Sequence, residues 1–218
     1  MNSPLILATG FSVFPGAPEN PTAWAMEELG RSGWQPDRAR LVTRTLPVTF
    51  DLWDSVVAPL LAELKPDAVV AFGLSAKALG VTLESTARNR VAADRPDFSG
   101  AYSILSCVSE TGPEIYPTRL PMTDIVRRLH KIEVPFARSD DAGDYVCNLL
   151  FYKLMALADA GGPRIAGFVH VPYLDSQVAR LAAAGNEVTH TATLAEAQLM
   201  TAVKSIVSVC ADALAQKV

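Results

Sequence analysis

The sequence contains few cysteines and little excess charge, and each shortage excludes a class of protein. Cys107, Cys147 and Cys210 are an odd and sparse set among 218 residues. Such a set is typical of a reducing compartment rather than of a disulfide framework. The net charge of −4 comes without a basic cluster, so nucleic acid and anionic membranes are poor candidates as partners.

Targeting signals are scarce as well. The first apolar run, residues 5–8, has no charged region before it and therefore predicts a first β-strand rather than a signal peptide. No apolar run approaches the length that spans a membrane. We therefore expect a soluble, cytoplasmic protein.

The overall composition is typical of a globular chain, because half of the residues are apolar and 19% are charged. We expect one domain over residues 1–218, built as a three-layer α/β/α fold with a mostly parallel, twisted central sheet, since expected strands alternate with expected helices. Residues 101–118 are expected to be extended. The expected strands are 4–10, 40–46, 67–73, 81–89, 134–138 and 164–170. The expected helices are 21–33, 49–65, 121–131, 176–184 and one that contains Cys147. A last helix is expected to start at Thr193, where Thr193-x-x-Glu196 forms a capping box.

The stretch 139–152 reads as a turn that leads into a helix. Ser139, Asp140 and Asp141 are residue types that cap helix starts. Cys147 would then lie in the first turns, where free N–H groups and the helix dipole favour a thiolate. A buried structural cysteine is the alternative, because residues 150, 151 and 154 follow Cys147 at core spacing. From this stretch alone the core interpretation is favoured.

A cysteine nucleophile needs a base and a group that orients the base. His170 ends an apolar strand and Glu84 lies in an expected strand, although alone each is more typical of a structural histidine and a solvated glutamate. Ligands of open α/β sheets bind beyond the carboxyl ends of the strands. We expect the segments after Gly10 and Gly73, the turn before Cys147 and the end of the His170 strand to converge there.

Five blocks of residues, in one order along the chain, carry more information than these single residues. They are Thr9-Gly10-Phe11-x-x-Phe14 with Asn20-Pro21-Thr22; Leu46-Pro47-Val48-x-Phe50 with Lys65-Pro66-Asp67 and Gly73-Leu74; Glu84-x-x-Ala87-x-Asn89 with Pro96-Asp97 and Gly100; Ser139-x-x-Ala142-Gly143-x-Tyr145-x-Cys147-Asn148-x-x-x-Tyr152; and Gly167-Phe168-x-His170-x-Pro172-Tyr173 with Gln177. Over nearly its whole length the chain resembles pyroglutamyl peptidase type I, also called pyrrolidone-carboxylate peptidase.

The resemblance implies a thiol protease of the exopeptidase kind, with Cys147, His170 and Glu84 as its catalytic triad. Such an enzyme hydrolyses the N-terminal pyroglutamyl (5-oxoprolyl) residue from small peptides through a thioester intermediate, and requires no metal or cofactor. Phe11 and Phe14 would form the aromatic walls of the lactam pocket; without the resemblance, core packing is the better interpretation of both. The resemblance also implies a homotetramer, with which the exposed-looking residues Trp53 and Tyr173 are compatible.

The chain departs from the family pattern at several positions. Ser85 replaces an arginine after the glutamate, and residues 76–79 replace a Gly-Gly-Arg element. Asp94 stands where the family has an arginine near the oxyanion site, so either Arg95 serves there or backbone N–H groups at the Cys147 helix do. Asp144 replaces a threonine, and its charge would oppose a neighbouring thiolate.

Two other functions stay open. The same fold with impaired or altered activity, binding a related lactam, is favoured by the missing arginines. A nucleoside- or nucleotide-binding α/β protein is a weaker alternative, because Gly10 is followed by neither a Gly-x-x-Gly loop nor a Walker-type lysine.

Overall fold

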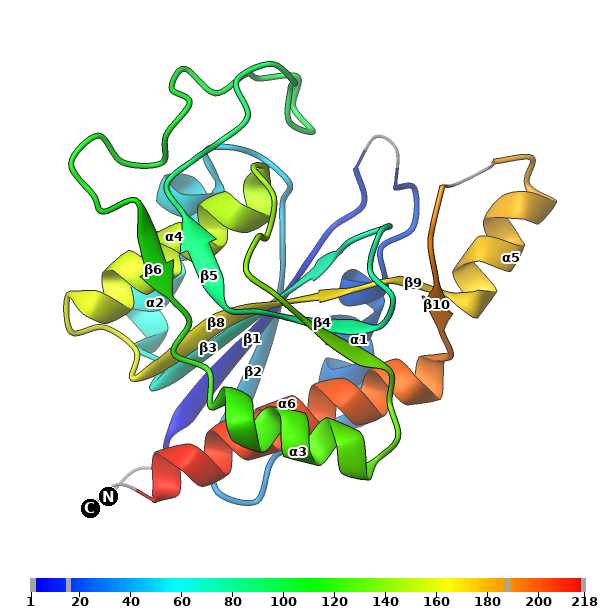
Figure 1. Ribbon diagram of the computed structural model, residues 1–218. Helices are drawn as coiled ribbons and strands as arrows, with labels where there is room; N and C mark the ends of the chain where they lie inside the picture. Colours follow the sequence, from blue (N-terminus) through cyan, green and yellow to red (C-terminus); the bar gives the residue numbers. More distant parts are fainter. Residues whose placement is uncertain (1–2, 15–16, 187–188, 217–218) are drawn as a thin grey trace.

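A central six-stranded sheet organises the computed structural model, which describes residues 3–14, 17–186 and 189–216. Its strand order is β2-β1-β3-β8-β4-β7 (Figure 1). The prediction of an α/β fold with a mainly parallel sheet is therefore confirmed. The strands are β1 Leu5–Phe11, β2 Arg40–Leu46, β3 Ala68–Leu74, β4 Val81–Glu84, β7 Phe136–Ser139 and β8 Ile165–Val171.

Two strands run against the other four. The pairs β1–β2, β1–β3 and β3–β8 are parallel, whereas β4 is antiparallel to β8 and carries β7 parallel to itself. The carboxyl ends of β4 and β7 therefore point to the opposite edge from those of β1, β3 and β8. The turn before Cys147 therefore starts at the opposite edge from the other three segments, but all four segments contribute residues to one pocket, as expected.

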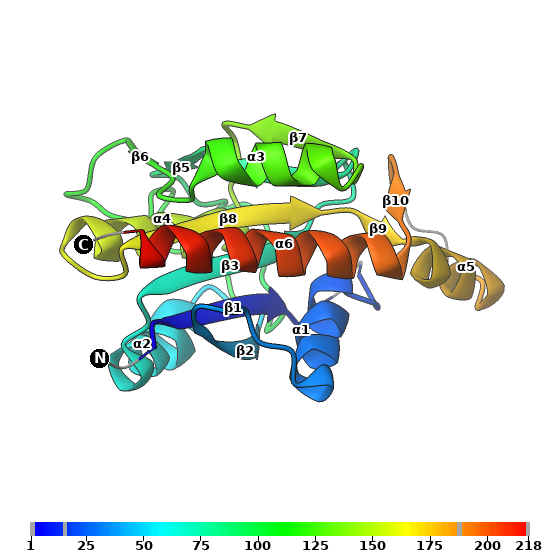
Figure 2. The same ribbon diagram turned by 90° about the horizontal axis from the view of Figure 1, so that it is seen from below.

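Helices cover both faces of the sheet and complete the three layers (Figures 1 and 2). One core contains residues of α1, α3 and α6, and the other contains residues of α2 and α4. Each helix contributes an apolar stripe, as a surface helix of a layered fold must. The bounds are α1 Pro21–Ser32, α2 Ala58–Leu64, α3 Met122–Lys131, α4 Val146–Asp159 and α6 Glu196–Ala215.

The alternation of side chains along the strands assigns each residue to one of these cores. Ile6, Val70 and Val169 face the α6 side, whereas Leu7, Ala71 and Phe168 face the α4 side. Because the period of a strand is two residues, Gly73 and His170 also face α4. The same period places Glu84 on this face, since its strand neighbour Leu83 faces the α6 side.

Several smaller elements differ from the expectation. The helix expected over 49–65 is divided into the π-helical turn η1 Trp53–Val57 and α2. Only β6 Ile115–Pro117 is extended within 101–118, and it pairs with β5 Thr86–Arg88. Tyr173 is buried in β9 Tyr173–Leu174, so the expectation that it is exposed is wrong. The remaining elements are α5 Asp175–Ala183 and β10 Thr193–Leu194, which pairs with β9.

The last helix differs from the expectation at its start and in its length. Thr193 lies in β10 and is hydrogen-bonded to Asp175, and the helix instead begins after Ala195, whose N–H donates to Gln198 Oε1 at 3.0 Å. Among the described residues α6 is the one helix long and apolar enough to cross a membrane. Half of its most apolar stretch is buried inside the molecule, which is also the property of a core helix.

Candidate active site

A buried histidine and a buried glutamate meet on the α4 face of the sheet. His170 of β8 and Glu84 of β4 are joined by a hydrogen bond of 2.8 Å between Nδ1 and Glu84 Oε1. Both residues are buried, at 7% and 2% exposed. A carboxylate at Nδ1 fixes the orientation of the ring and favours the tautomer that leaves Nε2 for another partner.

Cys147 of α4 supplies that partner. Burial alone would lower the pKa of His170, but hydrogen bonds to Cys147 and Glu84, together with their charges, raise it to about 9. The imidazolium form is therefore favoured at neutral pH beside the sulfur. Cysteine, histidine and glutamate are thus connected in that order, which is the arrangement of an activated nucleophile.

The absence of a side chain at Gly73 allows the sulfur to approach the sheet. Gly73 pairs with His170 across β3 and β8. A Cβ atom at this position would lie 3.0 Å from Cys147 Sγ and 2.8 Å from the ring of Phe168. A glycine is therefore required here if Sγ is to sit against the sheet next to the imidazole.

Cys147 is the second residue of α4, as the sequence predicted for a thiol at a helix start. The N-cap is Tyr145, and no side chain caps this helix, so the expectation that Ser139, Asp140 or Asp141 caps it is wrong. Along α4, the first backbone N–H group that donates to a backbone carbonyl is that of Leu149, which bonds to Tyr145 O at 3.1 Å. The N–H groups before it are the donors that a helix start offers to an anion.

The cysteine, histidine and glutamate described above open onto one pocket of about 570 Å³. Phe11 and Phe14 both lie in its wall, together with Val48 and Leu74. Glu84, Cys147 and His170 line the same pocket. A mainly apolar cavity of this size with a few convergent polar groups is typical of a small-ligand site. Within the described residues, no group of three or more His, Cys, Asp or Glu side chains is arranged to hold a metal ion.

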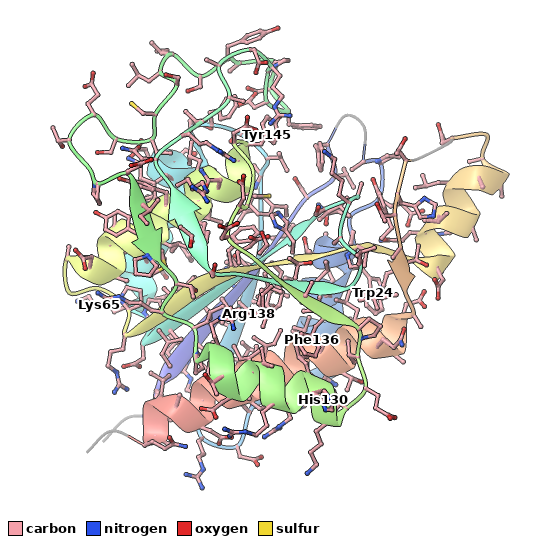
Figure 3. All side chains as sticks on the ribbon, viewed as in Figure 1. Trp24, Lys65, His130, Phe136, Arg138 and Tyr145 are labelled. Atoms are coloured by element: carbon pink, nitrogen blue, oxygen red, sulfur yellow. The ribbon has the colours of Figure 1, made fainter. Side chains whose placement is uncertain are left out.

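Arg95 lies outside this lining and is 52% exposed. Its guanidinium is paired with Asp144 and lies over the ring of Tyr145, 5.1 Å from the centroid. Asp94 is exposed, and the hydroxyl of Ser85 donates to Ser139 O at 2.8 Å. The structure therefore brings Cys147, His170, Glu84, Phe11 and Phe14 together, whereas Arg95 is engaged elsewhere. Figure 3 shows Tyr145 at the upper end of the connection between β7 and α4.

Asn148 is a site residue whose role the sequence did not predict. Its buried side chain accepts from Arg88 N–H at 3.0 Å and donates to Arg88 O and Arg90 O, both at 2.8 Å. It thereby attaches the start of α4 to the end of β5 and to the residues that follow it. Its place beside Cys147 in the nucleophile block was the one available signal.

Fold and site together define a three-layer α/β hydrolytic enzyme with a cysteine nucleophile. The sequence model of the pyroglutamyl peptidase family matches residues 5–212. The chain belongs to this family of cysteine-type peptidases, which confirms the resemblance inferred from the five blocks.

Individual relatives agree with this assignment. The pyrrolidone-carboxylate peptidase of Cupriavidus pinatubonensis is 38% identical over 177 residues, which cover 80% of this chain and 81% of the relative. The crystal structure of pyrrolidone carboxyl peptidase from Pyrococcus furiosus superposes with a TM-score of 0.87 at 30% identity, covering 96% of this chain and 99% of that one. Pyroglutamyl peptidase I from Bacillus amyloliquefaciens gives 0.83 at 29% identity, covering 96% and 97%.

Proposed function

We propose that the protein removes the N-terminal pyroglutamyl residue from peptides, with Cys147 as nucleophile, His170 as acid and base, and Glu84 as the group that orients the imidazole. The observation that carries the proposal is the buried imidazole bonded to Glu84 on one side and to Cys147 on the other. Membership of the pyroglutamyl peptidase family supports the choice of substrate.

The reaction has two stages. Cys147 Sγ, its proton held by His170, attacks the carbonyl carbon of the pyroglutamyl residue and forms a C–S bond. His170 then gives its proton to the amide nitrogen as the C–N bond breaks and the shortened peptide leaves. In the second stage His170 takes a proton from water as the water oxygen attacks the thioester carbon. The C–S bond breaks, His170 returns the proton to Sγ, and pyroglutamate is released.

The negative oxygen that forms during each stage needs hydrogen-bond donors. The free N–H groups at the start of α4 lie next to Sγ and supply them in this proposal. Arg95 is the alternative donor. It would first have to leave Asp144, with which it is paired.

The pocket suits a small, neutral lactam. Phe11 and Phe14 provide apolar walls for the ring, and this substrate carries no charged amine that would need a counter-charge. A buried polar group that pairs with the lactam amide would be left unsatisfied by peptides without the ring, which gives the selectivity of such a site.

Release of p-nitroaniline from pyroglutamyl p-nitroanilide tests the proposal. We expect turnover by the unaltered protein and its loss in Cys147→Ser, whereas Cys107→Ser, a change of a half-buried cysteine outside the pocket, keeps it. A folded protein with an intact Cys147 and no turnover would instead favour the same fold with altered activity. The engagement of Arg95 by Asp144 is the observation that supports that second candidate.

A further inference from the structure

Three arginines of segment 88–95 face three aspartates of the connection between β7 and α4. We name this set the arginine–aspartate ladder, and its pairs are Arg88–Asp140, Arg90–Asp141 and Arg95–Asp144. The pairs follow the same order along both segments. Cys147 comes three residues after the last aspartate, so the ladder holds the stretch of chain that leads to the nucleophile.

The central pair also holds the backbone of Gly143, which lines the pocket. Asp141 Oδ1 accepts the N–H of Gly143 at 2.9 Å, and Arg90 Nε donates to Gly143 O at 3.3 Å. Gly143 has a φ of 84°, a conformation that favours glycine. Arg90 and Asp141 together therefore fix both polar groups of the residue at which the chain turns toward α4.

Charge favours the central pair when Asp141 is ionised. Burial alone would raise the pKa of Asp141, but its hydrogen bonds to Arg90 and Gly143, together with the charges of Arg90 and Arg88, bring this pKa below its usual value. The carboxylate is thus ionised throughout the neutral range. Asn148 of α4 donates to the carbonyls of Arg88 and Arg90, so the segment that carries the arginines is also held against the start of α4.

We infer that Arg90 is a positioning residue for Cys147, acting through Asp141 and Gly143 on the turn that presents the thiol. The side chains of Arg90 and Asp141 are 43% and 44% exposed, and ion pairs with this exposure contribute little to folding stability. Geometry is more sensitive, because a displacement of about 1 Å at a reacting group can change a rate about 100-fold. The inference rests on the proposed function for its kinetic part only.

The test compares Arg90→Met and Arg90→Lys with Arg119→Met. Arg119 provides a matched control, since it forms an exposed pair with Asp159 at 3.2 Å and lies outside the pocket. The measurements are kcat and KM for pyroglutamyl p-nitroanilide, the thermal midpoint of unfolding, and the rate of Cys147 alkylation by iodoacetamide from pH 5 to about 9, which spans the ordinary and raised pKa of His170. All variants carry Cys107→Ser, and Cys210 stays silent because burial raises its pKa to about 12.

We expect Arg90→Met to lower kcat by about 10-fold to 100-fold with a smaller change in KM, and to slow alkylation. Arg90→Lys should recover part of both losses, while Arg119→Met changes neither. The thermal midpoints of Arg90→Met and Arg119→Met should be similar. Equal kcat and alkylation rates in these two variants would overturn the inference, as would a loss in Arg90→Met that only follows a lower thermal midpoint. If the unaltered protein does not cleave the substrate, the proposed function fails, and the alkylation rates still decide the role of Arg90.

Discussion

At the scale of the residue, the role proposed for the imidazole of His170 predicts a reaction that depends on pH. Its pKa of about 9 means that the imidazolium is present below that pH and is lost as the pH rises through it. The carboxylate of Glu84 is one source of this raised pKa, because it stabilises the charged ring. In Glu84→Gln the pKa should therefore fall, and the alkaline limb of kcat/KM should move to lower pH by about one unit or more.

The profile of kcat/KM against pH, recorded for pyroglutamyl p-nitroanilide, checks this prediction. Glu110→Gln serves as the control, since Glu110 is exposed and lies outside the pocket. An alkaline limb at the same pH in Glu84→Gln and in the unaltered protein would show that Glu84 does not set the charge of the imidazole.

A second prediction at this scale concerns the space at Gly73. In Gly73→Ala the new Cβ would meet Cys147 Sγ at 3.0 Å and the Phe168 ring at 2.8 Å. We expect a loss of about 1–3 kcal/mol in the free energy of unfolding, the usual cost of overpacking. Activity should also fall, because Sγ must move away from His170. Denaturant titration and kcat/KM measure the two effects.

Gly30→Ala is the matched control for this change. Gly30 lies in α1, and a Cβ there meets only Thr43 Oγ1, at 3.4 Å. Since alanine favours a helix over glycine by about 1 kcal/mol, this variant should be unchanged or more stable. If Gly73→Ala behaves in the same way, the close approach of the thiol to the sheet is not a constraint.

The residues of the site were predictable to different degrees. His170, Glu84 and Cys147 were indicated by their blocks in the family resemblance, whereas the common face of His170 and Glu84 follows from the strand pairing in the structure. Arg90 and Asn148 make contacts between residues that are 51 to 60 positions apart in the sequence. No local pattern reports such a contact, so their roles emerged only from the structure.

At the scale of the element, local signals succeeded where a helix starts by itself and failed where tertiary pairing decides. Asn20 and Pro21 open α1 as predicted, with the Asn20 side chain accepting from Thr22 N–H. Asp140 and Asp141 are residue types that cap helices, but they form ion pairs with Arg88 and Arg90 of another segment instead. The reversed direction of β4 and β7 likewise depends on pairing rather than on sequence pattern.

The connection before α4 gives a prediction at this scale. Asp144 is paired with Arg95, three residues before the thiol. In Asp144→Thr the negative charge is removed and the Arg95 cation is released, and both changes favour a thiolate at Cys147. The pH at which alkylation reaches half its maximal rate should therefore fall. Adding Arg95→Met to Asp144→Thr should return it toward its original value, and superimposable curves for all three proteins would reject the electrostatic coupling.

At the scale of the whole molecule, the order of the strands explains why distant blocks form one site. β3 and β8 are neighbours although about 100 residues separate them, and β4 follows at the outer side of β8. The glycine, histidine and glutamate blocks therefore lie on three adjacent strands, under the helix that carries the cysteine block. The alternation of strands and helices in the sequence predicted the three layers, but the order of the strands in the sheet became known only from the structure.

The surface of the molecule supports a last prediction, on assembly. The long segment between β5 and β6 extends from the body of the protein (Figure 1) and displays four large apolar side chains. These are Phe98, Tyr102, Ile104 and Leu105, and Ile104 is 97% exposed. Tyr102, Ile104 and Leu105 line one hollow of the surface, and exposed apolar side chains that lie together are typical of an interface. We therefore propose that copies of the chain associate through this segment into the homotetramer that the family resemblance implies.

Light scattering after size-exclusion chromatography measures the mass directly. We expect the unaltered protein at about four times the chain mass of 23.3 kDa and Ile104→Lys in a smaller assembly, because a charge buried without a partner opposes association. Val13→Lys, a change of an exposed apolar residue outside the segment, should keep the tetramer. A monomeric unaltered protein would exclude the tetramer. An unchanged mass in Ile104→Lys would show that the interface lies elsewhere. A lysine at this exposed position opposes association only if another copy of the chain covers it.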